Sequence, residues 1–191
     1  MKQNRDLFWN LVESEHLRAR AFCRKLMGSR DDGDDLYQDS LVCALARFNS
    51  LRKIEAFRPW LYRIMINRFK NHRRRSWWKR FLPLTDETAD SPVGVNPYPA
   101  IAARRRLEIG FKALSPDEQA LIMLHEMNGW TIAELAGMTG KSEGNVRVRL
   151  TRARRKMREA LIRFFKGSGS EEIENILLSE VEICIAPKPE E

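Results

Sequence analysis

Residues 131–158 read TIAELAGMTGKSEGNVRVRLTRARRKMR and carry the strongest structural signal in the chain. The pattern predicts two short helices joined by a tight turn at Gly140, with most of the arginines on the second helix. Thr131 with Glu134 three residues later is a capping signal for the first helix, and Ser142 marks the start of the second. A helix-turn-helix places its second helix in the DNA major groove, so a basic second helix predicts DNA binding.

Working outward from this segment, apolar residues recur at helical spacing, and residues 1–166 show no convincing strand alternation. A helix is predicted over residues 6–27, and a second begins in the aspartate run that precedes Tyr37. The predicted buried stripes include Leu45 on the second helix and Phe164 on the last. A third helix is predicted from Trp60 to about residue 75, with Leu61, Ile64, Met65 and Phe69 on one face.

The fold class is therefore expected to be all-α, with two helical domains joined by a flexible linker. We predict a first domain at residues 1–82, a linker at 83–99 that carries four prolines, and a helix-turn-helix domain at 100–166. Residues 167–191 begin with Gly-Ser-Gly-Ser, which is either a natural hinge or an engineered joint. The rest of that segment is acidic and fits a short helix or a strand.

Charge is distributed unevenly along the 191 residues. Residues 1–166 hold 33 Lys and Arg against 19 Asp and Glu, a net of +14, whereas residues 167–191 hold 1 against 7, a net of −6. A basic body favours polyanionic partners. The acidic tail could mask the recognition helix or contact a regulator, and it could also be a solvating tail or a fusion remnant.

Several classes of function are not indicated. The three cysteines (Cys23, Cys43 and Cys184) form no CxxC pair and the three histidines are scattered, so no disulfide, metal site or cofactor is expected. Reduced thiols suit a cytoplasmic protein. No Gly-rich phosphate loop or nucleophile–base pair points to an enzyme. No apolar run approaches the ~20 residues that a membrane span needs.

Three segments resemble one known family, the extracytoplasmic-function (ECF) subfamily of the sigma-70 family of bacterial RNA polymerase sigma factors. They are DDLYQDSLVCALARF (residues 34–48), FRPWLYRIMINRFKNHRRR (residues 57–75) and the helix-turn-helix with its flanks (residues 114–161). The resemblance covers residues 6–165. It implies a protein that is not an enzyme and that binds core RNA polymerase through the clamp and flap elements. It also implies promoter DNA and an anti-sigma factor as partners.

By this resemblance, the helix at residues 34–48 docks on the polymerase clamp. Its expected docking residues form an acidic and polar rim: Asp34, Asp35, Gln38 and Asp39. An acidic rim would repel DNA, which fits a protein partner. From the residues alone, the same acids could be ordinary capping residues on a solvated face.

The resemblance also implies that the N-terminal domain reads the −10 promoter element and helps to open it. Capture of unpaired bases needs a basic track and apolar platforms. The candidate residues are Trp60, Arg63, Asn67, Lys70, Asn71 and Arg74. Trp60 is either a platform or a core residue.

The C-terminal helix-turn-helix would read the −35 element as duplex. Base edges are usually reached from the start of the recognition helix, which here carries Ser142, Glu143, Asn145, Arg147 and Arg149. Arg147 is the best candidate for reading a base, because arginine pairs bidentately with guanine. Phosphate contacts are expected from Arg154, Arg155 and Arg158. A helix-turn-helix repressor that works without polymerase is the rival hypothesis, but it has no use for the helix at residues 34–48.

Overall fold

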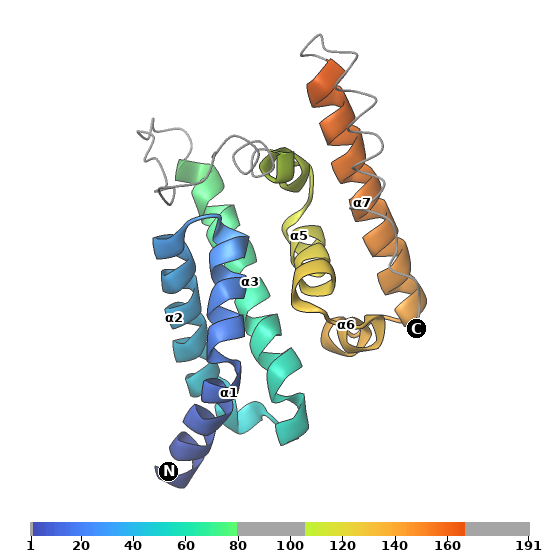
Figure 1. Ribbon diagram of the computed structural model, residues 1–191. Helices are drawn as coiled ribbons and strands as arrows, with labels where there is room; N and C mark the ends of the chain where they lie inside the picture. The colour runs from blue at the N-terminus through green and yellow to red at the C-terminus, as the bar shows by residue number, and fades with distance from the viewer. Residues whose placement is uncertain (1, 80–105, 167–191) are drawn as a thin grey trace, which may run out of the picture. The chain divides into compact units, whose positions relative to one another are not determined.

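The computed structural model describes residues 2–79 and 106–166 of the chain (Figure 1). All regular elements in these two ranges are helical, which confirms the predicted all-α class. The linker predicted at 83–99 and the tail at 167–191 lie outside the described residues. Contacts group residues 2–79 with 116–147 in one unit and residues 106–115 with 148–166 in another. The domain boundaries expected from the sequence stay a prediction.

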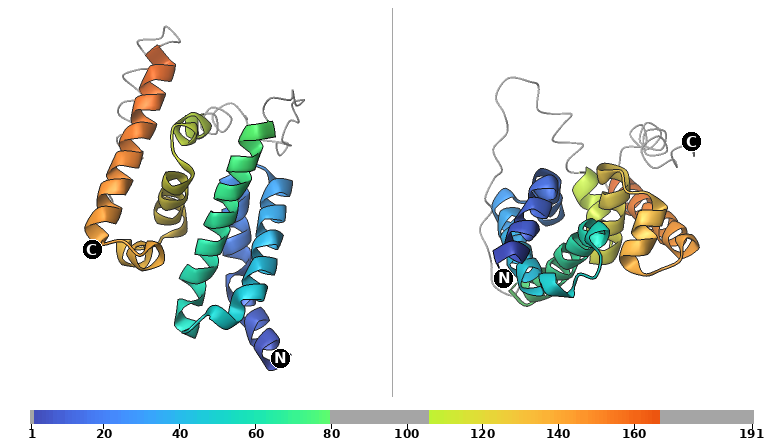
Figure 2. Two further views of the ribbon diagram at one scale, coloured as in Figure 1. Left: turned by 180° about the vertical axis from the view of Figure 1, so that it is seen from behind. Right: turned by 90° about the horizontal axis from the view of Figure 1, so that it is seen from below.

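The first helix, α1 (Lys2–Met27), runs beside α2 and α3 in all views (Figures 1 and 2). Its buried side chains recur at helical spacing and comprise Phe8, Val12, Ala19, Phe22, Cys23 and Leu26. The helix stops at Gly28, whose φ is +74° and whose N–H donates to the Arg24 carbonyl at 2.9 Å. A left-handed glycine is a common helix terminator.

The second helix, α2 (Arg30–Arg47), crosses α1 closely. Ser29 caps it by accepting a hydrogen bond from the Asp32 N–H at 3.4 Å. A Cβ on Gly33 would collide with the backbone of Arg24, so only glycine permits this approach. The expected stripe is wrong at Leu45, which is 36% exposed, because the buried face runs through Leu36 and Ala44 instead.

The third helix, α3 (Phe57–Lys79), follows two 3-10 turns, η1 (Phe48–Ser50) and η2 (Ile54–Ala56). All four residues expected on its apolar face are buried: Leu61, Ile64, Met65 and Phe69. Phe8 of α1 meets the rings of Phe48 and Phe57 edge-on, at centroid distances of 5.3 and 6.1 Å. This aromatic cluster fixes the start of α3 against α1.

After the undescribed gap, residues 106–112 are helical. They precede α5 (Pro116–Ile122), the π-helical turn η3 (Met123–Met127) and α6 (Ile132–Thr139). Within the first unit, α5 and α6 both contact α3. Trp130 is only 2% exposed, and its ring lies 5.0 Å from that of Tyr62 and 4.5 Å from the Arg58 guanidinium carbon. A tilted aromatic pair and a cation–π contact therefore join α3 to this segment.

The last helix, α7 (Glu143–Lys166), buries Val146, Leu150, Ala153, Met157 and Leu161, as its period predicts. The expectation for Phe164 is wrong: the residue is 37% exposed. It lies two positions before the end of α7, and its ring meets that of Phe165 edge-on at 5.3 Å. Among the described residues, no helix is both long and apolar enough to cross a membrane.

Candidate functional site

The two helices of the helix-turn-helix are α6 and the first part of α7, and local hydrogen bonds define their starts. The Thr131 hydroxyl accepts from the Glu134 N–H at 3.2 Å, and the Glu134 carboxylate accepts from the Thr131 N–H at 2.8 Å. The Ser142 hydroxyl accepts from the Asn145 N–H at 3.3 Å. These contacts confirm both capping signals.

The turn between α6 and α7 is also the one expected. Gly140 has a φ of +67°, and its N–H donates to the Ala136 carbonyl at 2.9 Å. Glycine adopts this left-handed conformation without the steric cost that other residues bear. The turn thus sets where the recognition helix begins.

The structure places the predicted α7 residues in two environments. Ser142, Glu143, Asn145, Arg147 and Arg155 are exposed, and Arg149, Arg154 and Arg158 are half-buried. Arg147 lies 3.6 Å from Glu143, with about half of each side chain exposed. Such an exposed i,i+4 pair contributes only about 0.3–0.5 kcal/mol. The guanidinium can therefore leave Glu143 for another partner at little cost in free energy.

On α3, most of the exposed polar residues share one face. Four of them, Arg63, Asn67, Asn71 and Arg74, are spaced four, four and three residues apart, and His72 is exposed beside this face. Lys70 is turned away from this face toward Asp117, with which it forms a 3.0 Å ion pair. We call Arg63, Asn67 and Arg74 the α3 stripe.

Trp60 sits at the start of α3 and is half-buried. Its ring centroid lies 6.0 Å from that of Phe57 and 6.5 Å from that of Phe48. Packing within the aromatic cluster therefore accounts for this tryptophan, with one part of the side chain left accessible.

Asp34 departs from the expected exposed rim. Arg20 and Arg24 of α1 each donate two hydrogen bonds to its carboxylate, at 2.7–2.8 Å, and the side chain is 19% exposed. The hydrogen bonds from Arg24 and Arg20 hold the pKa of this carboxyl well below its ordinary value. Asp34 therefore joins α2 to α1, and its role in polymerase docking stays a prediction.

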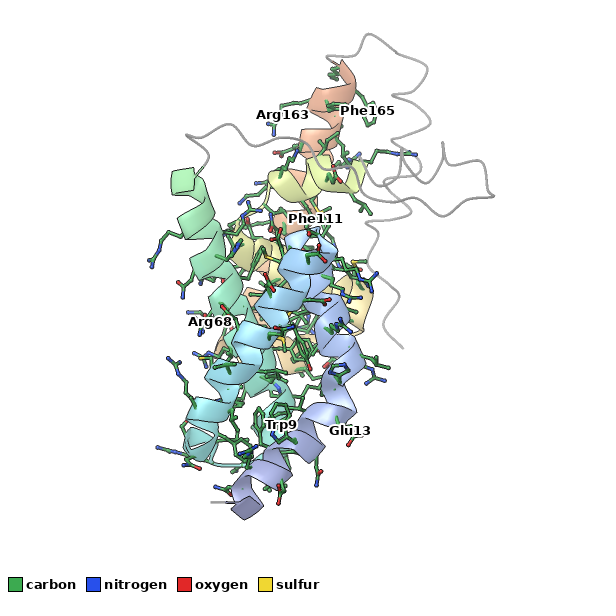
Figure 3. All side chains as sticks on the ribbon, turned by 90° about the vertical axis from the view of Figure 1, so that its left-hand side faces the viewer. Trp9, Glu13, Arg68, Phe111, Arg163 and Phe165 are labelled. Carbon is green, nitrogen blue, oxygen red and sulfur yellow. The ribbon has the colours of Figure 1, made fainter. Side chains whose placement is uncertain are left out.

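The other three rim residues, Asp35, Gln38 and Asp39, are exposed and line a hollow with a volume of about 330 Å³. Asp32 and Leu36 complete the α2 side of this hollow, and Arg68, Asn71 and His72 of α3 form the opposite side. Figure 3 labels Arg68 where α2 and α3 lie side by side. We call this feature the α2–α3 hollow.

Sequence reasoning missed Arg68 and His72. Their spacing with Asn71 puts all three on one helical face, but only the pairing of α3 with α2 shows what that face meets. Asn71, expected to touch DNA, stands at the border between the hollow and the α3 stripe.

No metal centre is evident in the described residues, and the thiol of Cys23 is not activated. They contain no group of three His, Cys, Asp or Glu side chains that could hold a metal ion. Cys23 is fully buried, and burial raises the pKa of its thiol to about 12. This thiol stays protonated at neutral pH and packs as a small apolar group.

Family models match two parts of the chain. The model described as Sigma-70 region 2 matches residues 11–79, and the model described as Sigma-70, region 4 matches residues 111–157. The ECF RNA polymerase sigma factor SigM of Mycobacterium tuberculosis is 31% identical over 160 residues, covering 83% of this chain and 79% of the relative.

Two solved structures share the fold. The sigma factor RpoE, solved with the anti-sigma factor NepR from Bartonella quintana, aligns with a TM-score of 0.55 at 23% identity, over 84% of this chain and 98% of that one. CnrH, solved with the cytosolic domain of CnrY, aligns with a TM-score of 0.56 at 24% identity, over 81% of this chain and 86% of that one. At these identities the likeness concerns the fold.

Proposed function

This chain belongs to the extracytoplasmic-function RNA polymerase sigma factors of the sigma-70 family. From that we infer which of its surfaces binds polymerase and which bind the two promoter elements. The chain is a sigma factor that directs RNA polymerase to promoters. One observation carries the inference: a basic recognition helix, a second polar and basic helix, and an acid-lined surface occur together in one chain.

The helix-turn-helix would read the −35 element. Arg147 is exposed in the second turn of α7, close enough to the helix start to reach a guanine edge once it leaves Glu143. Arg155 is exposed two turns further along, where a side chain meets phosphates more readily than bases. Specificity would thus come from the first turns of α7 and affinity from the later ones.

The α3 stripe would meet the −10 element. Arg63 and Arg74 supply positive charge along one exposed face, and Asn67 between them can both donate to and accept from a base. Trp60 is partly accessible at the same end of the helix as Arg63. This arrangement suits a single strand of promoter DNA whose bases are unpaired.

The exposed acids of α2 would dock on the polymerase clamp. Asp35 and Asp39 are one turn apart on an otherwise basic protein, so they favour a basic protein surface over DNA. We infer that the chain acts by binding and not by catalysis, and that it works in the cytoplasm with core polymerase. Because one solved structure of the same fold is a complex with an anti-sigma factor, we also expect an anti-sigma partner here.

The test is transcription in vitro from a randomised promoter library, with bacterial core RNA polymerase, in the presence and absence of the chain. We expect transcripts that require the chain and share two spaced promoter elements. If the chain alone binds a duplex operator tightly and adds nothing to polymerase, the helix-turn-helix repressor is the better description.

A further inference from the structure

A cluster around Arg58 joins α3 to the segment that begins the helix-turn-helix. The Arg58 Nη1 donates a hydrogen bond to the Glu134 Oε1 of α6 at 3.2 Å, and its guanidinium carbon lies 4.5 Å from the centre of the Trp130 ring. The same ring lies 5.0 Å from that of Tyr62, one turn further along α3. We call Arg58, Tyr62, Trp130 and Glu134 the Arg58 cluster. It connects the helix that we assign to the −10 element with the helix-turn-helix that we assign to the −35 element.

A second contact between α3 and this segment withdraws a residue that was expected to touch DNA. Lys70 forms an ion pair with Asp117 of α5 at 3.0 Å. The two side chains are 41% and 45% exposed, so solvent screens the pair and it stabilises the contact little. While the contact persists, Lys70 is held away from the α3 stripe.

The Arg58 cluster is incompletely satisfied. The Arg58 Nε and the Trp130 Nε1 are buried, and neither has a hydrogen-bond partner among the described residues. Such groups have given up water without gaining a partner, and opening the contact would return both nitrogen atoms to water. The packed arrangement therefore carries a standing cost in free energy, which suits a contact that opens in use.

The packed arrangement cannot serve both promoter elements at once. Their names place the elements about 25 base pairs apart, which is about 85 Å of straight duplex at 3.4 Å per base pair. Arg63 lies five residues along α3 from Arg58, a span of about 8 Å in a helix. Arg147 lies thirteen residues along the chain from Glu134, a span of at most about 45 Å even at full extension. While the Arg58 cluster holds, Arg63 and Arg147 are therefore too close together to reach both elements.

The chain is long enough for α3 and the helix-turn-helix to separate. Residues 80–105 lie between the described part of α3 and the helix at 106–112. At 3.3–3.6 Å per residue, a chain of that length reaches up to about 90 Å. Separation thus requires no unfolding of α3 or α6.

We propose that the Arg58 cluster is an intramolecular latch: it holds α3 against α5 and α6 in the free chain, and Arg58 releases Trp130 and Glu134 when both promoter elements are engaged. The proposal rests on the proposed function and adds a closed state to it. Only the open state can engage both elements, so their binding draws the population toward it. Opening also frees Lys70 from Asp117 for contact with a phosphate.

The test is single-molecule energy transfer between two fluorophores on the full-length chain. They replace Arg18 on α1 and Lys141 after α6, both exposed, as non-natural amino acids that leave the native cysteines unlabelled. The free chain should show mainly high transfer. Arg58→Gln should raise the ratio of open to closed molecules about tenfold, because it removes the cation–π contact and the ion pair together. Arg47→Gln, at the exposed end of α2, makes the same change away from the cluster and should leave the ratio unchanged.

A second variant guards against a change in fold. Glu134→Gln keeps the capping box of α6 but loses the charge with which Arg58 pairs. The ratio of open to closed molecules should rise about threefold, with the circular dichroism spectrum unchanged. A free chain that shows mainly low transfer, or a ratio that neither variant changes, would refute the latch.

Core polymerase and promoter DNA separate the latch from the proposed function. The unaltered chain should pass to low transfer when it is bound with polymerase to a promoter from the randomised library. If that complex transcribes but keeps high transfer, the latch is wrong and the proposed function stands. If the two variants open the free chain but no promoter gives transcripts that require the chain, the latch contact is supported and the proposed function is wrong.

Discussion

The helices α1–α3 and the recognition helix α7 are both rich in charge, but they use it differently. In α1–α3 the ion pairs join separate helices: Asp34 of α2 binds two arginines of α1, and Arg58 of α3 lies 3.7 Å from Glu15 of α1. Two ion pairs of α7, Arg147 with Glu143 and Arg155 with Glu159, lie within the helix at i,i+4 spacing. The N-terminal ion pairs therefore support tertiary structure, whereas Arg147 and Arg155 of α7 can exchange their exposed partners for a ligand at little cost in free energy.

Removal of a core aromatic residue from α1 should give the largest effect on folding. Phe8 is fully buried in the aromatic cluster, so Phe8→Ala should lower the free energy of unfolding by about 3–5 kcal/mol. The measurement is urea unfolding followed by circular dichroism. The next residue, Trp9 (labelled in Figure 3), is 43% exposed, so Trp9→Ala is the matched control and should cost about 1 kcal/mol or less. Equal losses from both variants would contradict this assignment of the core.

The second-largest effect is expected on DNA binding by α7, with little change in the free energy of unfolding. Arg147→Ala should lose about 1–3 kcal/mol of discrimination at the cognate promoter, because a bidentate contact to one base is removed. Competition between cognate and altered promoters, each bound by the chain–polymerase complex, measures this quantity.

Arg155→Ala is the control for that experiment. It should weaken binding evenly across sequences and reduce the slope of log affinity against log salt by about 1, as expected for a phosphate contact. If Arg155→Ala changed sequence preference and Arg147→Ala did not, the roles assigned along α7 would be reversed.

Much of this comparison was predictable from the sequence. Helix periods and capping residues predicted the turn at Gly140 and the buried face of α3, because those signals are local. Asp34 and Arg68 were not predictable in the same way. Whether a charge on one helix meets a partner depends on how α1, α2 and α3 pack, and spacing along one helix does not encode that. The burial of Leu45 was predicted wrongly for the same reason, because a small rotation of α2 about its axis changes which of its residues face the core.

A smaller effect on stability should come from the capping box of α6. Thr131→Ala removes a side-chain acceptor and should cost about 1 kcal/mol. Thr139 is the control, because its hydroxyl donates back to the Leu135 carbonyl at 2.7 Å and the Ala136 carbonyl at 3.4 Å, contacts within the helix that add little to its stability. Thermal unfolding compares the two variants. A Thr139→Ala loss as large as that of Thr131→Ala would argue against local capping as the cause.

The smallest effect is expected at the acid end of the stability profile. The pKa of Asp34 is held below its ordinary value, so its ion pairs stabilise the fold fully above the unfolded-state pKa of about 3.9 and are lost as the pH falls below it. Asp34→Asn should therefore lower stability at neutral pH and flatten the decline from about pH 5 downward. Denaturant midpoints measured across this range test it, and a decline as steep as that of the unaltered chain would show that Asp34 is not the group responsible.

Footprinting of the chain with core polymerase on a promoter chosen from the randomised library tests the central claim most directly. Hydroxyl-radical protection and permanganate reactivity should reveal two protected elements and unpaired thymines within the one nearer the start site, all requiring both chain and polymerase. Protection of one duplex site by the chain alone, with no unpaired thymines when polymerase is added, would contradict the account.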